Sequence, residues 1–176
     1  MQHEAMTKTL KSLKLFGMAQ AVAELATQGA PAYEGAQAML ESLLKAEIAE
    51  REVRSVSYQM KVARFPTYRD LAGFDFAQSA VNESLLRQLH RCEFIEQAHN
   101  VVLVGGPGTG KTHLATALGV QAIEHHHYRV RFFQTIELVN VLEAEKAAGN
   151  PGHLAHRLTH TDLVVLDELG YLPFSQ

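Results

Sequence analysis

The sequence lacks several features of secreted and membrane-bound proteins. It contains one cysteine, Cys92, so no disulfide can form within the chain, and a reducing compartment suits it. No apolar run approaches the roughly 18 residues that a membrane-spanning helix needs, and Met1–Glu4 opens no signal peptide. The formal net charge is only −3, so any surface that attracts a polyanion must be local. These absences predict a soluble, cytoplasmic protein that has no membrane contact.

The composition nevertheless supports a folded core. Hydrophobic residues make up 47% of the 176 residues, which argues against disorder, and the length suits one ordinary domain with a small appendage. Apolar residues spaced by three and four predict a helix over Met6–Thr27, which ends at Gly29–Pro31. A second helix is expected from about Tyr33 to Val62, before Pro66. Residues 1–66 are therefore expected to form a small all-helical module.

Residues 105–112 carry the strongest chemical signal in the chain. They read GGPGTGKT and match G-x-x-x-x-G-K-S/T, the phosphate-binding loop of nucleoside triphosphatases. Glycines allow backbone N–H groups to turn inward around a phosphate, which a Cβ would obstruct. Lys111 can reach the β- and γ-phosphates of ATP, and the Thr112 hydroxyl is placed to bind Mg²⁺. The predicted nucleotide-binding residues are Gly105, Gly106, Pro107, Gly108, Thr109, Gly110, Lys111, Thr112 and His113.

The residues around this loop favour the same interpretation. Asn100–Val104 reads NVVLV, which predicts a strand buried on both faces. Thr112–Val120 forms helices well and presents apolar residues on one side. A strand, a glycine loop and a helix in this order place the helix N-terminus against the anion.

A second group of acidic residues follows the apolar run Leu163–Leu166. That run predicts a buried strand, which would deliver Asp167 and Glu168 at its C-terminal edge, where ligands bind in open α/β sheets. Asp167 would hold Mg²⁺, and Glu168 is positioned to act as general base on the attacking water. One strand and one helix are expected between the two motifs, over Arg129–Phe133 and Thr135–Ala148. The helix is expected to turn Leu138, Val141 and Leu142 inward.

These elements predict an α/β fold with a parallel sheet over residues 100–176, preceded by a connector and a helix over 67–99. Asn82 is expected to cap that helix, which would run to Arg91. The cluster Phe74–Phe76 is expected to dock the helical module, and the alternative is that it flanks a base.

The later part of the second helix has a basic face. Arg51, Arg54, Lys61 and Arg64 fall within about 140° of the helix circumference. Such a stripe could hold the phosphodiester backbone of DNA. The alternative is a solvated face, because neighbouring glutamates can pair with these arginines; they are Glu47, Glu50 and Glu52.

Two segments resemble a known family. Gly105–Leu118 (GGPGTGKTHLATAL) and Asp162–Phe174 (DLVVLDELGYLPF) are similar to the two nucleotide motifs of the IstB-type transposition helper ATPases. That family belongs to the AAA+ proteins and is close to the DnaC helicase loaders. The segment Leu15–Ala19 (LFGMA) also resembles the N-terminal part of the family, so the resemblance covers essentially the whole chain.

The resemblance implies a P-loop fold of the AAA+ type, a three-layer sandwich around a parallel sheet after a small all-α module. It implies an ATP-dependent, DNA-binding homo-oligomer that assists the transposase of its insertion sequence in target selection. Matched by motif, Lys111 and Glu168 would serve catalysis, while Thr112 and Asp167 would hold Mg²⁺. It also favours DNA contact by the Arg51–Arg64 face.

The resemblance also implies elements that would follow Gln176: a strand between the two motif strands, a sensor residue and an arginine finger. The chain is therefore expected to be the N-terminal part of a longer protein, with an incomplete sheet and no multiple turnover. Three functions remain open at this stage. They are a transposition helper, a DnaC-type helicase loader and a catalytically inert nucleotide-binding fragment, and no motif specifies the partner.

Overall fold

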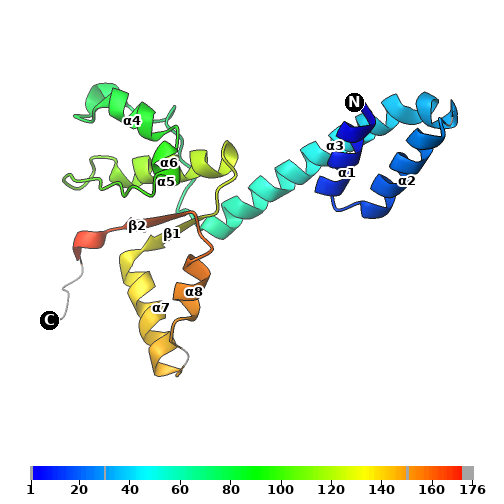
Figure 1. Cartoon of the computed structure of the whole chain (residues 1–176). Coiled ribbons are helices and arrows are strands. Elements are labelled where there is room, and N and C mark those ends of the chain that lie inside the picture. The colour runs from blue at the N-terminus through cyan, green and yellow to red at the C-terminus, as the bar shows by residue number, and fades with distance from the viewer. Residues whose placement is uncertain (1, 30, 150, 172–176) are drawn as a thin grey trace. The chain divides into compact units, whose positions relative to one another are not determined.

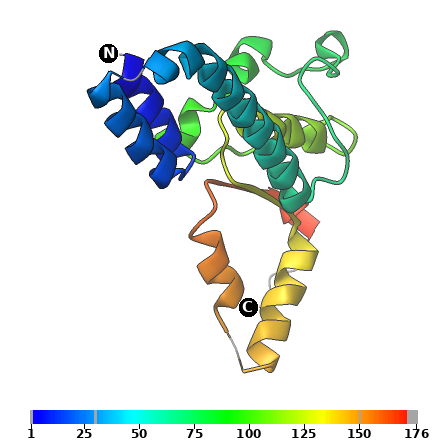
Figure 2. The same ribbon diagram turned by 90° about the vertical axis from the view of Figure 1, so that its right-hand side faces the viewer.

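The first part of the chain is all helical. In the computed structural model, which describes residues 2–29, 31–149 and 151–171, α1 (Gln2–Ser12) and α2 (Phe16–Gln28) pack beside the start of α3 (Pro31–Ala63), as Figure 2 shows. Their shared core consists of Met6, Leu10, Leu13, Ala19, Val22, Tyr33 and Leu44. Burying such side chains stabilises each by about 1.5–3 kcal/mol, which lets three amphipathic helices hold together.

The prediction of one helix over Met6–Thr27 is wrong, because the chain turns between α1 and α2. Lys14 adopts a left-handed conformation with φ 61°. The Lys14 N–H donates to the Lys11 carbonyl at 3.0 Å, and the Leu15 N–H donates to the Leu10 carbonyl at 2.9 Å. This is the Schellman arrangement, which glycine usually supports, and here packing of Leu15 against the core stabilises it without glycine. Because Lys14 stands where glycine is usual, no signal in the sequence marks the end of α1.

The chain divides into two compact units, Met1–Ser55 and Val56–Gln176. The division falls within α3, which runs over nearly the range predicted for the second helix. The family-specific residues Leu172–Phe174 lie outside the described residues. No described helix has both the length and the apolar character required to span a bilayer.

The second unit contains a parallel sheet, of which β1 (Val130–Gln134) and β2 (Leu163–Asp167) are the described strands. Both were predicted from their apolar runs. Figure 1 shows α6 (Lys111–Glu124) on one side of the strands and α7 (Thr135–Ala147) with α8 (His153–Leu158) on the other. This is a layered α/β arrangement. Its core consists of Ala63, Cys92, Ala122, Ile123, Val130, Phe132 and Val165.

A charged clamp fixes the register of the two strands. The Arg129 guanidinium donates to both carboxylate oxygens of Asp162, at 2.9 and 3.0 Å, and the Arg129 N–H donates to the same carboxylate at 2.8 Å. Hydrogen bonding from Arg129 accordingly lowers the pKa of Asp162. These residues precede the two strands, so the clamp starts a ladder that ends with Gln134 opposite Asp167.

The prediction of a buried strand over Asn100–Val104 is wrong, because this segment has no regular secondary structure. Among the described residues, β1 and β2 pair only with each other. Leu103 packs against Leu71, Leu86 and Leu114, whereas Val102 and Val104 are 77% and 91% exposed. A strand needs hydrogen-bonded neighbours to form, and an apolar run does not supply them.

Two further expectations about burial are wrong. In β2, Val165 is buried but Val164 and Leu166 are 36% and 44% exposed, because α6 packs on β2 whereas on the other side of the strands α7 contacts mainly β1. In α7, Val141 and Leu142 are more than 40% exposed, although the helix itself was predicted correctly. Periodicity predicts which residues share a face, but a packing partner decides whether that face is buried.

Short helices lie in the connector between α3 and the glycine loop, within the second unit. They are the 3₁₀ turn η1 (Phe76–Gln78), α4 (Glu83–Leu89) and α5 (Glu93–Glu96), and a second 3₁₀ turn, η2 (Leu169–Tyr171), follows β2. The predicted cap is confirmed, since the Asn82 carboxamide oxygen accepts from the Leu85 N–H at 3.0 Å. Cys92 is buried, and burial raises the pKa of its thiol to about 11, so it serves packing.

Candidate functional site

The glycine loop leads directly into α6, as predicted. Its residues Gly105–Gly110 precede the helix, and the Leu114 N–H donates to the Gly110 carbonyl at 2.9 Å. The Thr109 hydroxyl donates to the Gly106 carbonyl at 2.8 Å and closes the loop on itself. The N-terminal turn of α6 therefore follows a tight loop, the arrangement in which backbone N–H groups and the helix dipole favour an anion.

Lys111 lies across this loop. Its ammonium donates to the carbonyls of Gly105 and Gly106, at 2.9 and 2.6 Å. Carbonyl oxygens are weaker partners for a cation than phosphate oxygens, because the phosphate carries a full negative charge. The Lys111 ammonium is thus positioned to exchange these carbonyls for the oxygens of a phosphate held by the same loop.

Asp167 meets the loop from the end of β2. Its carboxylate accepts from the Thr112 hydroxyl at 2.8 Å, and its backbone carbonyl accepts from the Thr135 hydroxyl at 2.6 Å. The parallel register brings this about, because the carboxyl ends of β1 and β2 lie level, with Gln134 opposite Asp167. The two predicted motifs, far apart in the sequence, are therefore in direct contact.

Glu168 follows in an unusual conformation. It has a φ of 60°, its backbone N–H donates to the Asp167 carboxylate at 3.1 Å, and its side chain is exposed. A left-handed non-glycine residue costs about 1 kcal/mol or more, and such strain clusters at functional sites. The strain here turns the chain directly after the strand, next to Asp167.

The donor set at Thr112 and Asp167 fits Mg²⁺. A hydroxyl and a carboxylate are the hard oxygen ligands that this ion prefers, and it commonly uses one or two protein ligands together with water and phosphate oxygens. Among the described residues, no cluster of three or more histidine, cysteine, aspartate or glutamate residues could hold a metal by itself. Two oxygen ligands from the chain leave the other positions around such an ion to water and phosphate oxygens.

The connector supports the loop, which the sequence did not reveal. The ring of Phe74 lies against Gly110, where a Cβ would come within 2.6 Å of it. The same ring packs edge-on against His113, with 5.3 Å between ring centroids, and the His113 imidazole contacts the Asp70 carbonyl at 2.8 Å. The prediction that this cluster docks the helical module is wrong for Phe74, because its ring packs on Gly110 of the phosphate loop and on His113 of α6. Its sequence neighbours offered no signal for this partner.

Gly110→Ala is expected to weaken ATP binding about fivefold or more, because a left-handed alanine is strained by about 1–2 kcal/mol and its Cβ would displace Phe74. Adding Phe74→Ala removes the clash but not the strain, so the double variant should recover part of the affinity. Calorimetric titration measures both effects. Gly17→Ala is the matched control, because a Cβ there meets nothing within 4 Å. Equal affinity of Gly110→Ala and the parent would contradict the loop geometry.

The four predicted DNA-binding residues differ in their contacts. The Arg51 guanidinium pairs with Glu47 at 2.6 Å and donates to the Leu13 carbonyl at 3.0 Å, and Arg54 pairs with Glu50 at 3.1 Å. Lys61 and Arg64 are exposed, and neither pairs with a carboxylate in the part of the chain that the structure describes. The pairing with glutamates that the solvated-face alternative expects is therefore present at Arg51 and Arg54.

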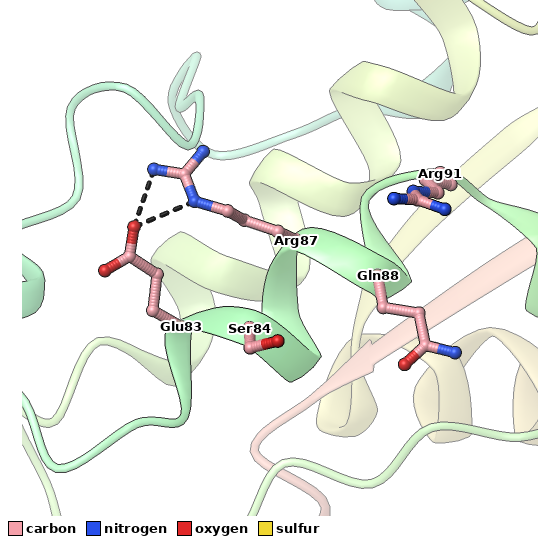
Figure 3. Close-up of a pocket in the computed structure, with 5 residues that line it drawn as sticks. All are labelled: Glu83, Ser84, Arg87, Gln88 and Arg91. Atoms are coloured by element: carbon pink, nitrogen blue, oxygen red, sulfur yellow. Dashed lines mark hydrogen bonds and ion pairs between the residues drawn. The ribbon is translucent and has the colours of Figure 1, made fainter.

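One hollow lies on α4, lined by none of the phosphate-loop residues. It is an open depression of about 680 Å³ on α4, lined by Glu83, Ser84, Arg87, Gln88 and Arg91. Figure 3 shows Arg87 folded back onto Glu83, with two nitrogens on one carboxylate oxygen at 2.6 and 2.8 Å. Arg87 also lies over the Phe76 ring, 5.8 Å from its centroid. Because Glu83 already compensates the charge of Arg87, we assign no ligand to this depression.

A glycine loop at a helix N-terminus, with a strand-borne aspartate bonded to the threonine of that loop, defines a P-loop nucleotide-binding protein. Comparison with known proteins specifies the family. The model of the IstB-like ATP binding proteins matches residues 8–176, and the chain belongs to this family.

Individual relatives agree with that assignment. A protein named as an insertion sequence IS21 ATP-binding protein from Pseudomonas aeruginosa is 34% identical over 95% of this chain and 63% of its own length. One named for insertion sequence IS5376 from Geobacillus stearothermophilus is 35% identical over 74% of this chain and 52% of its own length. A third, named for IS232 from Bacillus thuringiensis, is 31% identical over 97% and 68%. The chain thus spans about half to two thirds of these relatives.

Proposed function

We propose that the protein is an ATPase of the AAA+ type that helps an insertion sequence to transpose. It binds DNA, acts as a homo-oligomer and assists the transposase of the same element in target selection. The names of its relatives support the link to insertion sequences. The observation that carries the enzymatic part is the 2.8 Å contact between Thr112 and Asp167, because it unites the two nucleotide motifs.

The residues around that contact divide the chemical work. Lys111 supplies positive charge to the β- and γ-phosphates, and the loop amides orient the phosphate chain. Thr112 and Asp167 would hold Mg²⁺, which when bound neutralises charge on the phosphate oxygens. Glu168 orients the attacking water and accepts its proton, because its side chain follows the metal-binding aspartate at the open edge of the sheet.

The proposal includes DNA contact by Arg51, Arg54, Lys61 and Arg64, and the exposure of all four supports it. Exposed ion pairs are worth about 0–1 kcal/mol, so a DNA phosphate can replace Glu47 or Glu50 as the partner of Arg51 or Arg54. Lys61 and Arg64 need no such exchange. We therefore expect the end of α3 to contribute most to binding.

The test is a strand-transfer reaction with the transposase of the same insertion sequence and a target plasmid. The protein with ATP should raise insertion into the target several-fold, and Lys111→Ala should abolish the increase. Lys146→Ala, which removes an exposed charge from α7, is the matched control and should behave as the parent.

Insertion at the same frequency with and without the protein would contradict the proposal. Loading of a replicative helicase, without any effect on insertion, would favour the helicase-loader function instead.

A further inference from the structure

Three arginines from separate elements meet at the C-terminal end of α3. Arg64 follows that helix, Arg131 lies on β1, and Arg157 lies on α8. All three line one small hollow of about 100 Å³, and its remaining walls are largely apolar. Those walls are formed by Val62, Ala63, Phe132, Phe133, Leu154 and Leu158. We call the three residues the arginine cluster.

The positive charge of the arginine cluster has no carboxylate partner in the part of the chain that the structure describes. Within residues 2–29, 31–149 and 151–171, no carboxylate pairs with any of its three guanidiniums. Arg131 donates one N–H to the carbonyl of Val62, which lies in the last turn of α3. Its other N–H groups remain available to an anion. Burial lowers the pKa of Arg131, and repulsion from Arg157 and Arg64 lowers it further. Like charges that converge without a counter-charge favour the binding of an anion.

We propose that the arginine cluster binds a backbone phosphate of DNA. This inference rests on the proposed DNA-binding function, and it adds Arg131 and Arg157, from β1 and α8, to a surface that begins on α3. A guanidinium presents its donors in a fixed fork that matches the oxygens of a phosphate group. Three forks around one hollow can hold a single phosphate in a defined position.

The size of the hollow indicates a phosphate of a polymer. Small-molecule sites usually measure about 300–1,000 Å³, so 100 Å³ is too small to enclose a nucleotide but large enough for one phosphate group. Arg64 and Arg157 are exposed, which leaves room for a chain to continue on either side. Lys61, in the last turn of α3, extends the basic surface beyond Arg64. The nucleotide already has its own phosphate site at Lys111.

The test measures the salt dependence of duplex DNA binding by the complete protein. The double variant Arg64→Gln/Arg157→Gln should flatten the slope of log K against log salt by up to about 0.9, the value for one lost phosphate contact, and each single variant should flatten it by no more than that. The change should be the same on two unrelated duplexes, because phosphate contacts carry no sequence information. Arg131 is left unchanged because it also holds α3. Arg87→Gln removes an arginine of equal charge that is paired elsewhere, so its slope should match the parent.

Arg157→Lys separates charge from folding, since it keeps the charge and should retain a slope close to that of the parent. If Arg64→Gln and Arg157→Gln bind like Arg87→Gln while the parent binds DNA, the arginine cluster is not a phosphate site. A loss of ATP affinity with an unchanged DNA slope would also overturn the inference, because the cluster would then serve the nucleotide. A parent without salt-dependent DNA binding would refute the proposed DNA-binding function itself.

Discussion

Glu168→Gln is expected to slow ATP hydrolysis about a hundredfold or more while ATP remains bound, the usual scale for loss of a general base. The amide keeps the size of the side chain and leaves Lys111, Thr112 and Asp167 in place, so binding should change little. Phosphate release in the presence of duplex DNA and the transposase measures turnover, and calorimetry measures affinity.

Glu143→Gln, on an exposed position of α7, is the control for loss of a carboxylate and should hydrolyse ATP like the parent. Unchanged turnover in Glu168→Gln would exclude this residue as the base. A parent that binds ATP but releases no phosphate under these conditions would refute the hydrolytic part of the proposed function.

Lys111→Ala should reduce ATP affinity about tenfold or more, because a hydrogen bond to a charged group is worth about 1.5–3 kcal/mol. In the structure the ammonium is held by two loop carbonyls, from Gly105 and Gly106, and the alanine variant loses both contacts without leaving a buried charge. The fold should therefore survive the substitution, and the loss should reflect binding.

Calorimetric titration measures the ATP affinity of Lys111→Ala and of the control Lys146→Ala. The control removes a lysine in the last turn of α7, far from the glycine loop in the sequence. Equal affinities for the two variants would mean that the phosphates bind elsewhere. Thermal unfolding of both proteins checks that the loop variant remains folded.

Local patterns predicted most elements around the glycine loop, but not the irregular segment Asn100–Val104, which was expected to be a strand. The glycine loop, the helix that follows it and the runs at β1 and β2 all carry dense local signals, and the contact between Thr112 and Asp167 follows from the parallel order of the strands. The turn after α1 was missed because Lys14 takes a conformation that glycine usually supplies. A local pattern cannot reveal a turn that is stabilised by packing against a core.

Partners distant in the sequence account for the other differences. Phe74 supports the loop by packing against Gly110, which is distant from it in the sequence. No local sequence pattern near either residue predicts this contact. The arginine cluster likewise depends on the tertiary arrangement of α3, β1 and α8. Arg51 was correctly recognised as able to pair with a glutamate, but its second contact, with the Leu13 carbonyl, depends on the packing of the helical module.

The exposed valines and leucine beside the nucleotide site have a thermodynamic consequence. In the folded chain Val102 and Val104 are 77% and 91% exposed, and Val164 and Leu166 are still 36% and 44% exposed. The heat capacity of unfolding rises by about 0.45 cal/K/mol for each Å² of apolar surface that becomes hydrated, so Val102 and Val104 add little to it, and Val164 and Leu166 add less than they would if they were fully buried. The stability of this unit should therefore vary less steeply with temperature than that of a domain of equal size in which the corresponding apolar side chains are buried. A molecule that covers these side chains would increase the curvature together with the stability.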